Sequence, residues 1–215
     1  LFPVNLQILF WLAFASSFIS PILILNFRET PFPVQKKQLE SFWKFVSNTP
    51  KYLVKFPIFS RYLVVRSLLG LGLMANSFYA VYAVQRFELT AGTIGIFTMI
   101  ILLTQSLMSF VWGAIGDRFG FKMVYCLSIL FIAFQGFAAM IARTDILFYF
   151  IAFCIGSVYA AVRTSDSNIV FEIAPPEETS RFIGMANTIL SPVLAVAPLI
   201  GGWLVDTFSY ATLFL

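Results

Sequence analysis

Two ionisable residues inside a long apolar run are the first candidates for chemistry. Arg163 and Asp166 fall within residues 146–173, a run rich in aliphatic and aromatic side chains. As a helix, the run would place them roughly 14 and 9 Å from Glu172, near its end. If the run crosses a membrane, a charge at that depth costs at least ~2.5 kcal/mol. Their spacing of three residues lets them pair on one helical face. Both interpretations stay open: a structural pair between helices, or groups that contact a solute or gate its path.

Several uncharged amides also lie deep in apolar runs. Amides in such positions either bond a neighbouring helix or line a polar cavity. Asn187 precedes Ser191 by four residues, so the two share a helical face. The candidates for cavity-lining groups are Asn76, Gln105, Gln135 and Asn187. Arg66, in the first turns of its run, can extend to the membrane interface, and we expect a structural role for it.

The residues for common enzymatic chemistry are missing from the sequence. It contains no histidine, and its two cysteines, Cys126 and Cys154, form no CxxC pair. Glutamates cluster near residue 175 without His or Cys partners, and no Walker A motif is present. We therefore expect neither an enzyme nor a metal site, and no cofactor. The cysteines are interpreted as buried structural thiols.

A short stretch, "WGAIGDRFGFK" at residues 112–122, concentrates charges and glycines between two apolar runs. A tight turn needs residues that tolerate positive φ and close approach, which glycine does. Asp117 could face the positive end of a neighbouring helix or pair with Arg181, while Arg118 or Lys122 pairs with Glu172. Such pairs would form and break at the membrane edge. The simpler interpretation is a turn whose charges fix the topology.

The composition places the chain in a membrane. Of its 215 residues, 60% are hydrophobic and 11% charged, whereas soluble domains average about 45–50% and about 25%. The net charge is +4, but the positive residues lie between the apolar runs. That distribution indicates membrane topology and argues against a nucleic-acid partner.

Apolar runs long enough to cross a bilayer as helices recur along the chain. They lack the short alternating pattern of barrel strands. We therefore predict an all-α, polytopic membrane helical bundle. The predicted spans are residues 1–27, 62–84, 91–112, 123–142, 146–173 and 182–205, with a seventh beginning at Tyr210.

Residues 28–61 break this pattern as a basic, proline-containing linker. Within "KKQLESFWKFV", the spacing of Leu39, Phe42, Trp43 and Val46 predicts an amphipathic helix at the membrane surface. Ten Lys and Arg residues lie on the linker's side of the predicted topology and two on the other. The positive-inside rule therefore predicts that the linker, residues 113–122 and residues 174–181 are cytoplasmic.

This order of elements resembles the major facilitator superfamily of secondary transporters. The motif G-x-x-x-D-R-x-G-x-K is carried by Gly113, Asp117, Arg118, Gly120 and Lys122, and Phe121 stands where the family usually has arginine. Glu172 and Arg181 are similar to the family's acidic-then-basic pair around the tenth and eleventh spans. The resemblance implies that these seven residues form a conformational switch.

On this resemblance residues 1–27 correspond to the sixth span and residues 28–61 to the central loop. Residues 62–215 then run from the seventh span to the start of the twelfth. The resemblance implies a missing N-terminal half of the same chain and transport of a small solute by alternating access. A gradient of the solute or of a coupling ion would drive it, in the plasma (inner) membrane. Pro192 and Pro198 would let the eleventh span bend. The alternative is a polytopic receptor that binds a ligand without transporting it.

Overall fold

The computed structural model describes residues 2–26, 41–87, 91–144 and 146–214. The chain divides into two compact units, Leu1–Phe45 and Val46–Leu215. The expectations that concern residues 28–40, including Leu39, Pro31 and Pro33, lie outside the described residues. The side chain of Phe42 lies outside them too.

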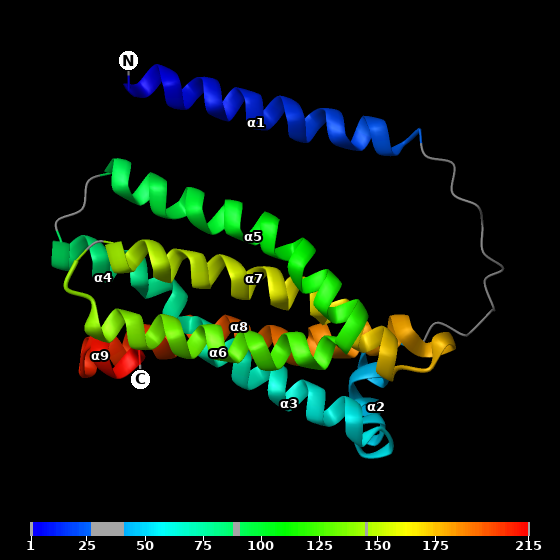
Figure 1. Ribbon diagram of the computed structural model, residues 1–215. Helices are drawn as coiled ribbons and strands as arrows, with labels where there is room; N and C mark the ends of the chain where they lie inside the picture. The colour runs from blue at the N-terminus through cyan, green and yellow to red at the C-terminus, as the bar shows by residue number, and fades with distance from the viewer. Residues whose placement is uncertain (1, 27–40, 88–90, 145, 215) are drawn as a thin grey trace. The chain divides into compact units, whose positions relative to one another are not determined.

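The described residues are helical almost throughout and contain no strand (Figure 1). The longer helices are α1 Phe2–Ile24, α3 Pro57–Gly72, α5 Ala91–Phe119, α6 Phe121–Ile141, α7 Ile146–Ile173 and α8 Thr179–Thr207. Shorter elements are α2 Phe42–Lys55, α4 Asn76–Phe87, α9 Tyr210–Phe214, and the 3-10 turns η1 Leu73–Ala75 and η2 Pro176–Glu178. The predicted all-α class is confirmed.

Six helical segments among the described residues are long and apolar enough to cross a membrane. Their bounds are Gln7–Ile24, Pro57–Phe87, Gly92–Phe119, Phe121–Ile141, Ile146–Ile173 and Pro176–Thr207. The second joins α3 to α4 through η1, so one span contains a short 3-10 stretch. Helix α9 begins at Tyr210, where the seventh apolar run was predicted.

The first span of the second unit begins earlier than the sequence suggested. Helix α2 ends at Lys55, and α3 starts at Pro57 rather than at Tyr62. Proline is well placed in the first turn of a helix, because its fixed φ suits the helix and its missing N–H has no partner there anyway. Arg66 consequently lies in the third turn of α3.

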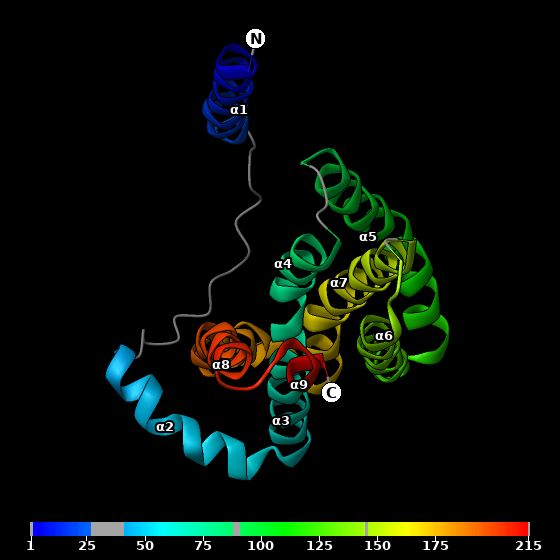
Figure 2. The same ribbon diagram turned by 90° about the vertical axis from the view of Figure 1, so that its left-hand side faces the viewer.

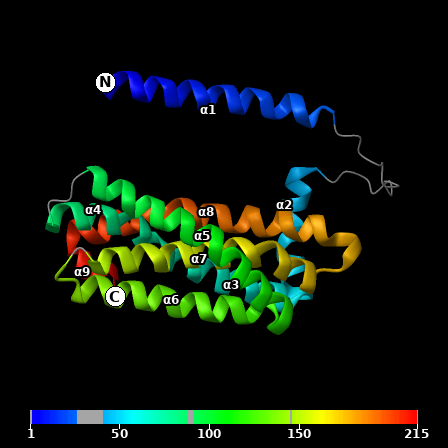
Figure 3. The same cartoon turned by 45° about the horizontal axis from the view of Figure 1, so that its top comes forward.

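Helix α7 is the centre of the second unit and packs most extensively against α5 and α6. Figures 2 and 3 show it between these two helices, while α8 lies beside α3. Most of the middle of α7 is buried, including Ile151, Ile155 and Val158. Many large apolar side chains of α5 and α8 are instead exposed, as expected where a helix faces lipid.

Small residues let α5 and α7 approach closely. A Cβ atom on Gly156 would stand 2.5 Å from the backbone oxygen of Ile101 and 2.8 Å from the Thr104 Cβ. The neighbouring Ala160 is buried in a cluster with Trp112 and Phe121. The side of α7 formed by Gly156 and Ala160 therefore packs against another helix.

Helix α5 extends seven residues beyond its predicted end at Trp112. It runs through Gly113, Asp117 and Arg118 to Phe119, and α6 begins at Phe121. The expected loop over residues 113–122 is therefore two turns of helix and a sharp corner. Only Gly120 forms that corner, with φ +85°, a value that favours glycine.

Phe121 packs back onto the helix that precedes it. Its ring atoms lie 2.3–2.8 Å from the point that a Cβ on Gly116 would occupy, so only glycine fits beneath the ring without rearrangement. The side chain is buried with Trp112, Val124, Ala160 and Ala161. The residue that departs from the family motif thus anchors the α5–α6 corner by apolar contact.

Replacing Gly120, which forms this corner, should destabilise the protein. We expect Gly120→Ala to lower the free energy of unfolding by about 1–2 kcal/mol, because an L side chain is strained at positive φ. Thermal unfolding of the purified protein in detergent would measure the loss. Gly113→Ala is the matched control, since this helical position has open space around it. It should be neutral or slightly stabilising. Equal losses for the two variants would contradict the argument.

Two aromatic residues near span ends are buried, and one cysteine differs from expectation. Trp112 and Tyr125 have exposed fractions of 2% and 5%. The Trp112 indole N–H donates to the Ser157 carbonyl at 2.9 Å. Cys154 is buried as predicted, but Cys126 is exposed. Span-end aromatics turn inward where a partner on another helix can accept their hydrogen bond.

Candidate functional site

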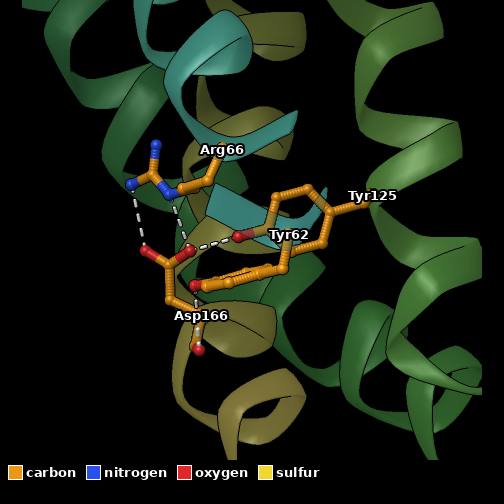
Figure 4. Close-up of polar contacts among 4 residues, drawn as sticks. All are labelled: Tyr62, Arg66, Tyr125 and Asp166. Carbon is orange, nitrogen blue, oxygen red and sulfur yellow. Dashed lines mark hydrogen bonds and ion pairs between the residues drawn. The ribbon is translucent and has the colours of Figure 1, made fainter. Parts of the chain in front are cut away.

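An ion pair between two spans is the most conspicuous polar feature of the second unit. Arg66 of α3 faces Asp166 of α7, with Nε donating to Oδ1 at 2.8 Å and Nη2 donating to Oδ2 at 3.0 Å. Figure 4 shows this parallel, two-pronged arrangement. Such a fork fixes direction as well as distance, which a single lysine contact would not do. The pair therefore joins the two helices in one orientation.

Two tyrosines complete the cluster around Asp166. The Tyr125 hydroxyl of α6 donates to Oδ1 of Asp166, and the Tyr62 hydroxyl of α3 donates to its backbone carbonyl at 3.4 Å. The tyrosine rings meet edge to face with their centroids 6.4 Å apart (Figure 4). Asp166 is thus held by two spans besides its own. The four residues Tyr62, Arg66, Tyr125 and Asp166 are called the Arg66–Asp166 cluster below.

The sequence spacing suggested Arg163 as the partner of Asp166, but the partner in the structure is Arg66. Arg163 is exposed, whereas Arg66 is buried, with an exposed fraction of 7%. The reason is the start of α3 at Pro57, which places Arg66 about 14 Å along its helix, while Asp166 lies about 10 Å from the end of α7. The two side chains therefore meet at a similar depth. The expectation that Arg66 extends to the membrane interface is wrong.

A cavity of about 130 Å³ opens beside the Arg66–Asp166 cluster, between α3, α7 and α8. Two of the candidates from sequence, Asp166 and Asn187, line it. Its wall combines the ion pair with hydroxyl, amide and aliphatic side chains. The lining residues are Tyr62, Arg66, Asp166, Ser167, Val170, Ile183, Ala186, Asn187, Leu190, Ser191 and Leu194.

The other three amides are not part of this cavity. Asn76 and Gln135 are buried and bond one another, with Gln135 Nε2 donating to Asn76 Oδ1 at 2.8 Å. Their position favours the interpretation as a link between helices α4 and α6. The backbone N–H of Gln105 lies at the close approach of α5 to Gly156.

The charged residues of the predicted switch lie at one end of the second unit. Asp117, Arg118 and Lys122 are exposed, and within the described ranges they form no ion pair with one another or with Glu172. Lys122 and Glu172 line a second, mainly apolar cavity of about 430 Å³ together with Arg61 and Tyr125. The Arg181 guanidinium lies 4.2 Å from the ring centre of Tyr52 in α2.

Sequence reasoning missed three members of the Arg66–Asp166 cluster. Tyr62 was placed at the boundary of a span, Arg66 was given a structural role at the interface, and Tyr125 was placed near the start of a span. A signal was nevertheless present. Tyr62 and Arg66 are four residues apart and share a helical face, so both can bond the same residue of another helix. Counting the span from Pro57 would have put both inside the membrane.

The side chains of the site offer hydrogen-bond donors and acceptors to a bound molecule. Across the described residues, no group of three His, Cys, Asp or Glu side chains gathers to hold a metal ion. The Asp166 carboxylate accepts hydrogen bonds from Arg66 and Tyr125. What remains is a small cavity with polar and apolar walls, inside a bundle of membrane-spanning helices. Such a site is of the kind found in integral membrane transporters, where solute sites lie between spans.

Comparison with known proteins identifies the family within that class. A family model described as the Major Facilitator Superfamily matches residues 63–215, and the chain belongs to this family. The chain is also similar to a rubrofusarin-specific efflux pump of Gibberella zeae, with 24% identity over 115 residues, which is 54% of this chain and 21% of the pump. The match thus spans about a fifth of that relative. No solved structure matches the chain.

Proposed function

We propose that this chain moves a small solute across the membrane by alternating access, driven by a solute or ion gradient. The observation that carries the proposal is the cavity between α3, α7 and α8, with the Arg66–Asp166 cluster in its wall. Membership of a transporter family supports the same function. The similarity to an efflux pump is consistent with export, but it covers too little of that protein to set the direction.

The buried position of the ion pair is energetically costly. Removing two charged groups from water is expensive even when they pair. A purely structural contact between α3 and α7 could be made more cheaply by aliphatic side chains of similar volume. A pair that instead lines a cavity can exchange partners as the solute enters and leaves. This favours a role in the transport pathway.

We further propose that the bundle works with a second set of spans from the same chain. Alternating access needs two groups of helices that rock around a shared site. The described cavity would then be one wall of a larger path. The basic segment before α3 would face the cytoplasm, and the protein would lie in the plasma (inner) membrane.

The first experiment is transport itself. The full-length protein, reconstituted into liposomes, should accumulate or release members of a solute panel when a proton or solute gradient is imposed. Accessibility of single cysteines placed at Asn187 and at Ala83, toward opposite ends of the spans, should change in opposite senses when solute is added. Binding without movement of any solute, and with static accessibility, would favour a receptor and contradict the proposal.

Asp117→Ala tests the predicted switch motif. We expect insertion and folding to be unchanged, because Asp117 is exposed and without an ion pair among the described residues, while the transport rate falls at least about tenfold. A tenfold fall corresponds to the loss of one charge-assisted hydrogen bond made by Asp117 in the conformation that is closed at the α5–α6 end. Solute flux in liposomes measures the effect, and Asp206→Ala, an exposed carboxylate at the far end of α8, is the control. If Asp117→Ala transports at the wild-type rate, the switch role is contradicted, and the charges of this segment serve only to fix the topology.

A further inference from the structure

One nitrogen of the buried arginine has no partner. Nε and Nη2 of Arg66 donate to Asp166, but Nη1 is buried and bonds no group in the described parts of the chain. The side chain as a whole is 9% exposed. A buried guanidinium N–H that lacks an acceptor is costly, and native proteins rarely leave one in place. An acceptor that comes and goes would explain why the position is kept open.

The unpaired nitrogen lies near the cavity, whose wall includes both Arg66 and Leu194. Nη1 stands 3.9 Å from where a Cβ on Gly70 would be, and Leu194 Cδ2 stands 2.8 Å from the same point. Leu194 is 40% exposed. A movement of this leucine would open space beside Nη1, and the glycine at position 70 adds no side chain there.

The backbone at Leu194 is also loosened. Residue 198 of α8 is proline, which has no N–H to donate to the carbonyl of Leu194 four residues earlier. A helix bends most readily where such a bond is missing. Leu194, which packs on Gly70 near Nη1, therefore sits at a weak point of α8.

Charge balance decides what kind of acceptor fits. Arg66 and Asp166 are the charged residues in the cavity wall, and together they are neutral. An anionic solute bound to Nη1 would leave a net negative charge in a poorly solvated site, which is unfavourable. An uncharged oxygen acceptor satisfies Nη1 and leaves the balance intact. Ser167 and Asn187, both exposed in the same wall, can bond a second polar group of the solute.

We propose that the cavity between α3, α7 and α8 binds an uncharged solute through a carbonyl oxygen that accepts a hydrogen bond from Nη1 of Arg66. This inference names the substrate class of the proposed transport function and rests on it. With a volume of about 130 Å³, the cavity holds one small ring with its carbonyl group, which would be one end of a larger solute.

The test compares three probes of similar size that differ in one property. Toluene has no acceptor, acetophenone has an uncharged carbonyl, and benzoate has a charged carboxylate. Their binding to the purified full-length protein in detergent is measured by the concentration dependence of the unfolding temperature. We expect acetophenone to bind and toluene to bind at least about tenfold more weakly, the difference that one hydrogen bond to a charged donor provides. Benzoate should also bind at least about tenfold more weakly, because it would leave a net negative charge in a poorly solvated site.

Two variants assign the preference to this site. Arg66→Lys keeps the positive charge opposite Asp166 but removes the free fork nitrogen, so acetophenone should weaken to the level of toluene. Asp166→Asn leaves a net positive charge in the wall, so the preference should reverse and benzoate should bind more tightly than acetophenone. Both variants are assayed as ratios between probes, which do not depend on their absolute stability.

The outcomes separate this inference from the transport proposal. Wild-type protein that prefers benzoate, binds all three probes equally or binds none of them would overturn the neutral-acceptor site, and a bound water would then explain Nη1. A preference for acetophenone that survives in Arg66→Lys would also overturn it. Failure of the liposome experiment with the acetophenone preference intact would instead leave a binding site in a protein that does not transport.

Discussion

Asp166→Asn should destabilise the protein by about 3 kcal/mol, because it leaves the Arg66 guanidinium buried without a counter-charge. Breaking a buried pair by removing one partner costs about 3–5 kcal/mol, and the partial exposure of Asp166 places this case at the lower end. The Arg66 side chain is 9% exposed and the Asp166 side chain is 34% exposed. Arg66→Leu should cost less, since the remaining carboxylate is the more exposed member and keeps its bond from Tyr125. Thermal or denaturant unfolding in detergent would rank the two variants.

The double variant Arg66→Leu with Asp166→Leu separates stability from function. Removing both charges avoids the unpaired ion, so stability should return to within about 1 kcal/mol of wild type. Transport in liposomes should remain lost, because the cavity then lacks its polar wall. A double variant that transports normally would show that the pair is only structural. A double variant as unstable as Asp166→Asn would show that the ion pair is not what destabilises the single variant.

Gly156→Leu should have the second large effect, by forcing α5 and α7 apart. Even a Cβ would approach the Ile101 oxygen to 2.5 Å, and backbone on the partner helix cannot move aside as a side-chain tip can. Overpacking a tight core typically costs about 1–3 kcal/mol, and contact with backbone at the centre of the unit points to the upper part of that range or beyond. We expect loss of folded, monodisperse protein on size-exclusion chromatography and an unfolding temperature below that of wild type.

The control for this substitution is Gly95→Leu. Gly95 lies in α5, is exposed, and has nothing within 4 Å of its Cβ position. The same change of residue should therefore be neutral or slightly stabilising, through the better helix propensity of leucine. Comparable losses at both positions would mean that glycine is needed for insertion into the membrane rather than for packing of α5 on α7.

The helical, membrane-spanning architecture could be predicted because it depends on long-range composition. Twenty or so consecutive apolar residues leave few alternatives to a span, and helices α6 and α7 begin or end within two residues of their predicted limits. The start of α3 and the end of α5 were harder to predict from the sequence. Pro57 reads as a loop residue unless it is recognised as a helix start, and Asp117 and Arg118 resemble a loop although α5 continues through them.

The candidate site could be predicted only in part, because pairing is a property of three dimensions. Asp166 and Asn187 were identified from their depth in apolar runs, and both line the cavity. The partner of Asp166 lies 100 residues away on α3, and spacing along one helix favoured the nearer Arg163. Asn76 and Gln135 have the same sequence signature as Asn187 but bond one another. Burial alone does not distinguish a cavity wall from a contact between two helices.

The packing of Phe121 on Gly116 determines how the α5–α6 corner responds to the surrounding salt. Exposed charges weaken as the ionic strength rises, over a Debye length of about 8 Å in physiological conditions. A buried ring held by dispersion contacts feels no such screening. With an aromatic side chain where a guanidinium would otherwise stand, the corner keeps its shape in dilute and concentrated electrolyte alike. Only the neighbouring Asp117, Arg118 and Lys122 remain subject to the ions in solution.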